Sequence, residues 1–244
     1  MPDTPWLPGF SGETGAVPRL VCLHHAGGTA STYQGWQRHL AGVAQVVPVL
    51  LPGRDRHVRA RPHAGLEPLA DELAETLIAH GLADRYAFFG HSMGALLAYE
   101  LSCRLRDRGH GEPLHLFVSG SRAPHLYGPA QVSDAEVLSA AGQHAVPESA
   151  VLRADLALCD SYAWTPRRPL RCPVTAFRGS DDPLANAVEV EAWRSYTQGS
   201  LVVRQVAGGH FFLAGAGRSR VLNALRAELA VFRSASDKGE PLCP

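Results

Sequence analysis

Short apolar runs alternate along the chain with segments that have the periodicity of helices. The runs have strand length and are rich in β-branched or aromatic residues; they cover residues 19–23, 45–51, 86–89, 116–118, 174–177 and 201–206. Between them, apolar residues recur on one helical face in 66–78 and again in 222–232. This alternation predicts an α/β fold, with a mostly parallel sheet, helices on both faces, and functional groups at the carboxyl ends of the strands.

Three segments depart from this alternation. Residues 1–17 and 234–244 are rich in polar and turn-forming residues without periodicity, so we expect flexible ends around a single domain at 18–233. Residues 129–169 contain helical patterns at 134–141 and 150–162 but no strand pattern. We expect this segment to be a short helical insertion over one end of the sheet, in the position of a lid.

The strand pattern at 86–89 leads directly into Gly90-His-Ser92-Met-Gly94, and a helical pattern follows. In the strand–G-x-S-x-G–helix arrangement, a sharp turn exposes the serine hydroxyl, and glycines two residues away avoid clashes with the neighbouring strand and helix. The helix N-terminus favours a developing oxyanion. This context predicts that Ser92 is a nucleophile of the α/β-hydrolase kind.

A general base and an acid should follow the serine in the order Ser, acid, His. His210 comes after the strand pattern at 201–206 and two glycines, which let an imidazole reach over the nucleophile. Asp181 and Asp182 occupy the turn after the strand pattern at 174–177. We choose Asp182 to orient His210, with Asp181 as the alternative.

The oxyanion requires two backbone donors, and Met93, directly after the nucleophile, supplies one. The other should come from the loop after the first strand, His24-His25-Ala26-Gly27-Gly28, where Ala26 is our candidate. We assign His25, Gly27 and Gly28 to substrate binding, with the glycines letting the backbone approach the substrate. Adjacent histidines on an extended chain point to opposite faces and no carboxylate cluster accompanies them, so we predict no metal site.

Composition and charge argue against two classes of partner, nucleic acids and membranes. Lys plus Arg equals Asp plus Glu at 23 each, which argues against a nucleic-acid partner. No apolar stretch approaches the ~18 residues of a membrane span, and residues 1–10 lack the pattern of a signal peptide. The five cysteines are odd in number and without paired spacing, as expected for reduced thiols in the cytoplasm.

Seven motifs in order resemble the type II, or editing, thioesterases of polyketide and non-ribosomal peptide synthesis. The resemblance covers about residues 18–232. The motifs are His24-His25-Ala-Gly-Gly, Tyr33-x-x-Trp36, Pro52-Gly53-Arg54, Gly90-His-Ser92-Met-Gly94, Leu152-Arg-Ala-Asp155, Gly179-x-x-Asp182-Pro183 and Gly208-Gly-His210-Phe-Phe. The combination of His-His-Ala-Gly-Gly with Gly-Gly-His-Phe-Phe is much more specific than G-x-S-x-G alone.

This resemblance implies hydrolysis of acyl groups from the phosphopantetheine arm of an acyl carrier protein, and of small acyl thioesters, without a cofactor. One departure from the family pattern stands out. The stretch 142–152 runs almost directly into the Leu-Arg-Ala-Asp helix, so a lid element is lost or shortened. That shortening leaves the acyl-chain selectivity of the family in doubt for this chain.

Two other interpretations remain at the level of sequence. The first is a carboxylesterase or acyltransferase of the same fold, because fold alone does not define the acyl acceptor or donor. The second is a non-catalytic binding protein of the hydrolase fold, against which the intact Ser92, His210 and aspartate candidates argue.

Overall fold

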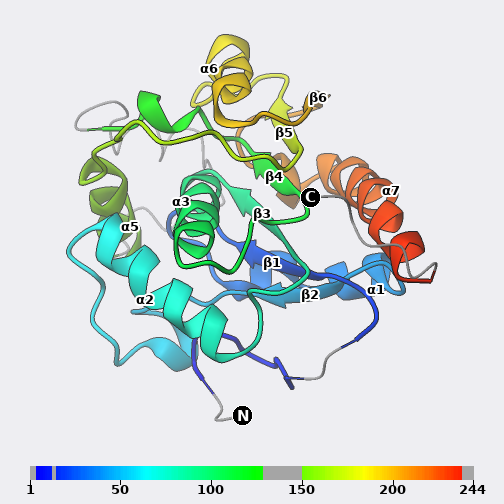
Figure 1. The fold of residues 1–244 in the computed structure, drawn as a ribbon. Coiled ribbons are helices and arrows are strands. Elements are labelled where there is room, and N and C mark those ends of the chain that lie inside the picture. Colours follow the sequence, from blue (N-terminus) through cyan, green and yellow to red (C-terminus); the bar gives the residue numbers. More distant parts are fainter. Residues whose placement is uncertain (1–3, 13–14, 129–149, 238–244) are drawn as a thin grey trace.

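A computed structural model describes residues 4–12, 15–128 and 150–237, and within these one parallel sheet forms the centre of the molecule (Figure 1). Its six strands lie in the order β2-β1-β3-β4-β5-β6. Their bounds are β1 Arg19–Leu23, β2 Gln45–Pro48, β3 Tyr86–His91, β4 Leu116–Ser119, β5 Val174–Gly179 and β6 Leu201–Val206. Leu23 pairs with Gly90 and His91 pairs with Ser119, so the loops after β1, β3 and β4 start at one edge of the sheet.

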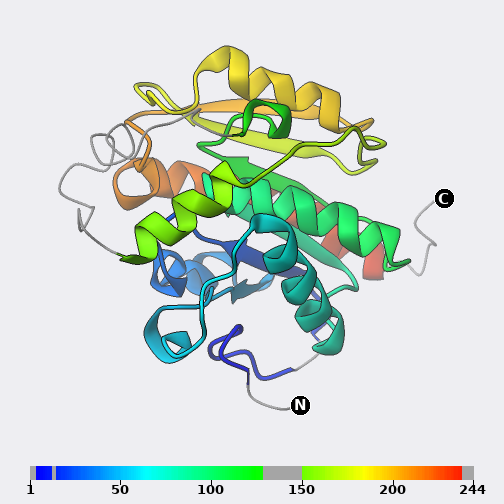
Figure 2. The same ribbon diagram turned by 90° about the vertical axis from the view of Figure 1, so that its left-hand side faces the viewer.

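Helices cover both faces of this sheet, as the alternating pattern predicts. They are α1 Trp36–Leu40, α2 Leu66–Ala79, α3 Met93–Asp107, α5 Ala150–Asp160, α6 Ala187–Glu191 and α7 Gly217–Asp237. Figure 2 shows α2, α3 and α5 on the near side of the sheet and α7 behind it. The helices α1 and α7 share one apolar core, whereas α2 and α3 belong to the other.

The period of two along the strands separates these two cores. In β1, Val21 and Leu23 face the core with α2 and α3, while Leu20 and Cys22 face the core with α1 and α7. All five residues of β1 are buried. A central parallel strand is buried on both faces, which is why its sequence reads as a continuous apolar run.

Most predicted elements are confirmed, with shifts at their ends. The strands β1 and β6 have the predicted bounds, β2 ends three residues early at Pro48, and β3, β4 and β5 extend beyond their apolar runs. The helix expected at 150–162 is α5 and ends at Asp160. Of the proposed insertion at 129–169, residues 129–149 lie outside the described residues, and so does most of the shortened stretch 142–152, whereas 161–169 follow α5 without a strand.

The expectation of a flexible segment at 1–17 does not hold for residues around Trp6. The side chains of Trp6 and Leu7 are only 5% and 2% exposed and join the core that contains α2 and α3. The Trp6 carbonyl accepts a hydrogen bond from the Leu50 amide at 2.8 Å. Two large apolar side chains among prolines and glycines bury enough surface to order this segment.

The expectation of a flexible tail at 234–244 does not hold for residues 234–237, which are helical because α7 continues through Asp237. Residues 238–244 lie outside the described part of the chain. Among the described helices, none combines the length and the apolar character that crossing a bilayer requires.

Candidate active site

Ser92 occupies a strained turn between β3 and α3. Its backbone has φ 54° and ψ −121°, a conformation that non-glycine residues seldom adopt and that costs about 1–3 kcal/mol. The two glycines of the motif make the turn possible. A Cβ on Gly90 would lie 2.1 Å from the Gly94 carbonyl oxygen, and one on Gly94 would lie 2.1 Å from the Leu23 carbonyl oxygen. The elbow therefore has the geometry that its sequence predicts.

His210 follows β6 and contacts Asp182, which follows β5. The His210 Nδ1 lies 3.0 and 2.9 Å from the two carboxylate oxygens of Asp182, and the side chains are 2% and 0% exposed. The Leu184 amide donates a further hydrogen bond to Asp182 Oδ1 at 2.9 Å. Asp181 instead accepts a hydrogen bond from the neighbouring Ser180 hydroxyl. Of the two aspartates in this turn, the structure thus brings Asp182 to the imidazole.

Two further groups pack against the imidazole of His210. The His91 ring lies 5.2 Å from the His210 ring, centroid to centroid, and its Nδ1 is 2.9 Å from the Ser119 hydroxyl oxygen. Burial, followed by the proximity of His210, holds the pKa of His91 well below its usual value, so His91 is neutral. Gly120 has φ 54°, and a Cβ there would lie 2.8 Å from His91 Cε1 and 3.4 Å from His210.

A cavity lies at the carboxyl edge of the sheet, beside the nucleophile and its base. Ser92 and His210 line it together with the two proposed oxyanion donors, Ala26 and Met93. Met93 is the first residue of α3, where the backbone amide has no acceptor within the helix. The other described lining residues are His25, Gly120, Arg122, Tyr127, Gly128, Leu156, Cys159, Asp160, Leu184 and Phe211. The wall is mainly apolar, which suits an acyl group.

His25, which we expect to bind substrate, lies in the wall of this cavity. Its ring packs edge-on against Phe211 at 4.9 Å, and its Nδ1–H donates to the Ala26 carbonyl oxygen at 2.8 Å. Burial is the main cause that lowers the pKa of His25, and the nearby His210 lowers it further. A neutral His25 adds no charge to the cavity wall.

Gly27 and Gly28, which we expect to bind substrate, make hydrogen bonds within the protein, and neither is among the described lining residues of the cavity. The Gly27 amide donates to Asp155 Oδ2 at 2.8 Å, and the Gly28 amide donates to the His25 carbonyl oxygen at 2.9 Å. Gly27 has φ 74° and faces Leu152 of α5. The glycines therefore let the loop turn back against α5.

Sequence reasoning missed the residues that hold this loop. Arg54 and Asp155, which belong to two of the family motifs, form a bidentate ion pair, at 2.9 and 2.7 Å, beside Gly27 and Gly28. Their side chains are 6% and 2% exposed. The available signal was that a charged residue stands at the end of each of two motifs, Pro52-Gly53-Arg54 and Leu152-Arg-Ala-Asp155.

Comparison with known proteins agrees with this fold. The model of the thioesterase domain family matches residues 18–229, so the chain belongs to the thioesterase family. The curated relative LgrE of Brevibacillus parabrevis is 37% identical over 214 residues, which are 80% of this chain and 81% of LgrE. LgrE is named a linear gramicidin dehydrogenase, whereas the family and the structures below carry the name thioesterase.

Two solved structures are closely similar. RedJ, a thioesterase from the prodiginine biosynthetic pathway in Streptomyces coelicolor, is 52% identical with a TM-score of 0.82, over 86% of this chain and 90% of RedJ. BorB, the type II thioesterase from the borrelidin biosynthetic cluster, is 31% identical with a TM-score of 0.80, over 92% of this chain and 97% of BorB. The similarity thus extends over nearly the whole of each chain.

Proposed function

We propose that this chain is a stand-alone editing thioesterase. It hydrolyses aberrant or stalled acyl groups from the phosphopantetheine arm of a carrier protein in polyketide or non-ribosomal peptide synthesis. The observation that carries the proposal is the contact of His210 with Asp182 beside the strained Ser92, in a mainly apolar cavity. The names of RedJ and BorB support the biosynthetic context.

The first step of the reaction is acyl transfer to the enzyme. Ser92 Oγ attacks the thioester carbonyl carbon while its proton passes to His210 Nε2, and Asp182 stabilises the imidazolium through Nδ1. The carbonyl oxygen becomes an oxyanion, which the amides of Ala26 and Met93 receive. When the tetrahedral intermediate collapses, the C–S bond breaks and His210 protonates the leaving thiolate.

The second step is hydrolysis of the acyl-serine. A water molecule attacks the ester carbonyl and gives its proton to His210 Nε2, and the same two amides receive the second oxyanion. Collapse then breaks the bond to Ser92 Oγ, which takes the proton back from His210. The free acid leaves, and the enzyme returns to its initial state without a cofactor.

Replacement of the nucleophile tests this mechanism. Ser92→Ala removes one hydroxyl group and should lower the turnover of an acyl-carrier thioester by about 10⁴-fold or more, with unchanged thermal unfolding. Initial rates of release of the free acid measure the effect. A variant that kept a tenth of the wild-type rate would show that Ser92 is not the nucleophile.

Two measurements separate this proposal from its alternatives. A carrier-bound thioester should have a much higher kcat/KM than the same acyl group on a small thiol or a simple alcohol, because the carrier and its arm contribute orienting contacts. Equal values would favour a general esterase. Labelling of wild-type enzyme by a fluorophosphonate, absent in Ser92→Ala, distinguishes an enzyme from a binding protein of the same fold.

A further inference from the structure

The loop that carries Ala26 is fixed by hydrogen bonds to successive peptide groups. The His25 carbonyl oxygen accepts from His24 Nδ1–H at 2.8 Å and from the Gly28 amide at 2.9 Å. Because a trans peptide group is planar, fixing the His25 carbonyl also fixes the direction of the Ala26 N–H on the opposite side of the same plane. The orientation of the proposed oxyanion donor thus depends on Gly28 staying in place.

Arg54 and Asp155 each bind one of the two glycines. Asp155 Oδ2 accepts the Gly27 amide at 2.8 Å, and Arg54 Nη1 donates to the Gly28 carbonyl oxygen at 2.8 Å. The same Arg54 Nη1 also binds Asp155 Oδ2 at 2.9 Å, while Nη2 binds Oδ1 at 2.7 Å. Arg54 Nε donates to the Pro52 carbonyl oxygen at 3.2 Å, which ties the guanidinium to its own loop.

This ion pair also connects the oxyanion loop to a wall of the cavity. Asp155 belongs to α5, and Leu152, one turn earlier, packs against Gly27. The neighbouring positions of the same helix, Leu156, Cys159 and Asp160, line the cavity beside Ser92. One face of α5 therefore contacts the loop, and the adjacent face of the same helix lines the cavity.

We propose that Arg54 and Asp155 are positioning residues for catalysis: their buried ion pair holds Gly27 and Gly28 so that the Ala26 amide points at the oxyanion. It follows that α5 is a required part of the oxyanion site, because Asp155 of this helix holds the loop that carries the Ala26 amide. The inference rests on the proposed function of Ser92. It goes further by assigning a task to two charged residues that touch neither the nucleophile nor its base in the contacts above.

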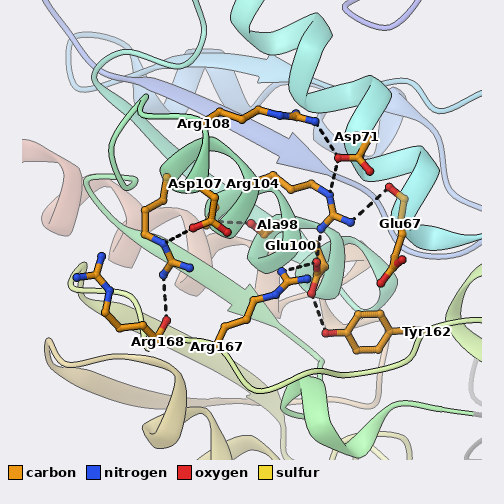
Figure 3. A network of polar contacts seen from close by, with 12 residues as sticks. Glu67, Asp71, Ala98, Glu100, Arg104, Asp107, Arg108, Tyr162, Arg167 and Arg168 are labelled. Carbon is orange, nitrogen blue, oxygen red and sulfur yellow. Dashed lines mark hydrogen bonds and ion pairs between the residues drawn. The ribbon is translucent and has the colours of Figure 1, made fainter.

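A second buried carboxylate provides the matched control. Glu100 of α3 is 1% exposed and binds Arg104, Arg167 and the Tyr162 hydroxyl, the last two at 2.8 Å (Figure 3). Tyr162 lies two residues beyond the end of α5, so this network also anchors that segment. It makes no hydrogen bond to the loop 24–28 among the contacts of the described residues. Glu100→Gln therefore weakens a comparable network without reaching the oxyanion loop.

The central experiment measures kcat and KM for an acyl-carrier thioester in four proteins. Asp155→Ala removes the acceptor of the Gly27 amide and should lower kcat by about 100-fold, as the loss of one oxyanion donor does, with KM changed less than about threefold. Asp155→Asn keeps an acceptor oxygen but no charge and should lower kcat by about tenfold. Glu100→Gln should stay within about threefold of wild type.

A double exchange separates positioning from simple charge pairing. Arg54→Asp with Asp155→Arg restores opposite charges, but it places N–H donors against the Gly27 N–H and a carboxylate against the Gly28 carbonyl. We expect this protein to remain as inactive as Asp155→Ala. Recovery of kcat to within about threefold of wild type would overturn the proposal, because only an ion pair as such would then be required.

A chemical readout keeps the test independent of the carrier. Phosphonylation of Ser92 by a fluorophosphonate also develops charge on an oxygen in the oxyanion site, so its maximal rate constant should fall in Asp155→Asn by a factor similar to the fall in kcat. An unchanged rate constant or an unchanged kcat in Asp155→Asn would overturn the inference. If Ser92→Ala remained active, the proposed function itself would fail, and the two failures are thus distinguishable.

Discussion

Two buried carboxylates, Asp155 of α5 and Glu100 of α3, both bind arginine side chains but differ in their other partners. Asp155 and Glu100 are each 1% exposed, and each binds arginine side chains. Asp155 also binds a backbone amide in the loop beside Ser92, whereas the contacts of Glu100 go to the side chains of Arg104, Arg167 and Tyr162. The first network holds peptide groups of the loop beside Ser92, whereas the backbone group that Arg104 reaches in the second is the Glu67 carbonyl of α2.

The difference shows what a buried ion pair contributes. Replacing a buried pair with apolar residues is often neutral for stability, since desolvation of the charges offsets their attraction. An ion pair that also forms hydrogen bonds with the peptide groups of a loop can instead hold that loop in one conformation. The network of Glu100 joins α3 to residues 162–167, while Arg104 extends it to Asp71 of α2 (Figure 3). We therefore expect Asp155 to affect catalysis and Glu100 to affect mainly stability.

The largest effect should come from a third buried carboxylate, which touches the base itself. Asp182→Asn favours the wrong tautomer of His210 and should lower kcat by about 10⁴-fold. Asp181→Asn is the matched control in the same turn, where the aspartate contacts Ser180, and it should retain activity within about threefold. Initial rates of both purified variants decide the order; a larger loss in Asp181→Asn would reverse our assignment of the acid.

An intermediate effect, on stability alone, is expected for the network of α3. Glu100→Ala leaves Arg167 and the Tyr162 hydroxyl without their carboxylate and should lower the free energy of unfolding by about 3 kcal/mol. Urea unfolding at pH 7 measures this loss. The comparison with Asp155 breaks down if Glu100→Ala keeps its stability but loses kcat by tenfold or more at a temperature where it is folded.

The smallest effect, a pH dependence of stability, is expected for a third pair of side chains. His115, in the segment before β4, lies 3.2 Å from Glu228 of α7. Burial lowers the pKa of His115 to about 4, against the opposing effect of Glu228. The unfolded chain, with a histidine pKa of about 6.5, binds more protons between these values, so stability falls as the pH drops from about 6.5 towards 4. At pH 5 the loss is on the order of 2 kcal/mol.

His115→Gln provides the control for this pH dependence. The variant should show a smaller difference in unfolding free energy between pH 7 and pH 5 than wild type, by about 2 kcal/mol, with kcat at pH 7 unchanged. Urea unfolding of both proteins at the two pH values gives the comparison. An identical decrease in both would assign the acid sensitivity to other groups, such as the buried His24 and His91, whose pKa values are also lowered.

The local features of the site were predictable because each depends on a few adjacent residues. The elbow at Ser92 needs glycines at fixed offsets, and the turn after β5 has only two aspartates to choose from. The structure then selected Asp182 by contact. The sequence did not show which groups Gly27 and Gly28 bind, because their partners, Asp155 and Arg54, are 128 and 26 positions away in sequence.

The sequence by itself determined the order of strands and helices, the parallel sheet and the positions of Ser92 and His210, since periodicity and turn chemistry act over a few residues. Only the tertiary structure decided three other matters. It placed Trp6 and Leu7 in the core, brought Asp182 to the base, and joined Arg54 to Asp155 under the oxyanion loop. Such contacts depend on which segments the folded chain brings together, and a charged residue gives no local sign of the distant backbone group that it will bind.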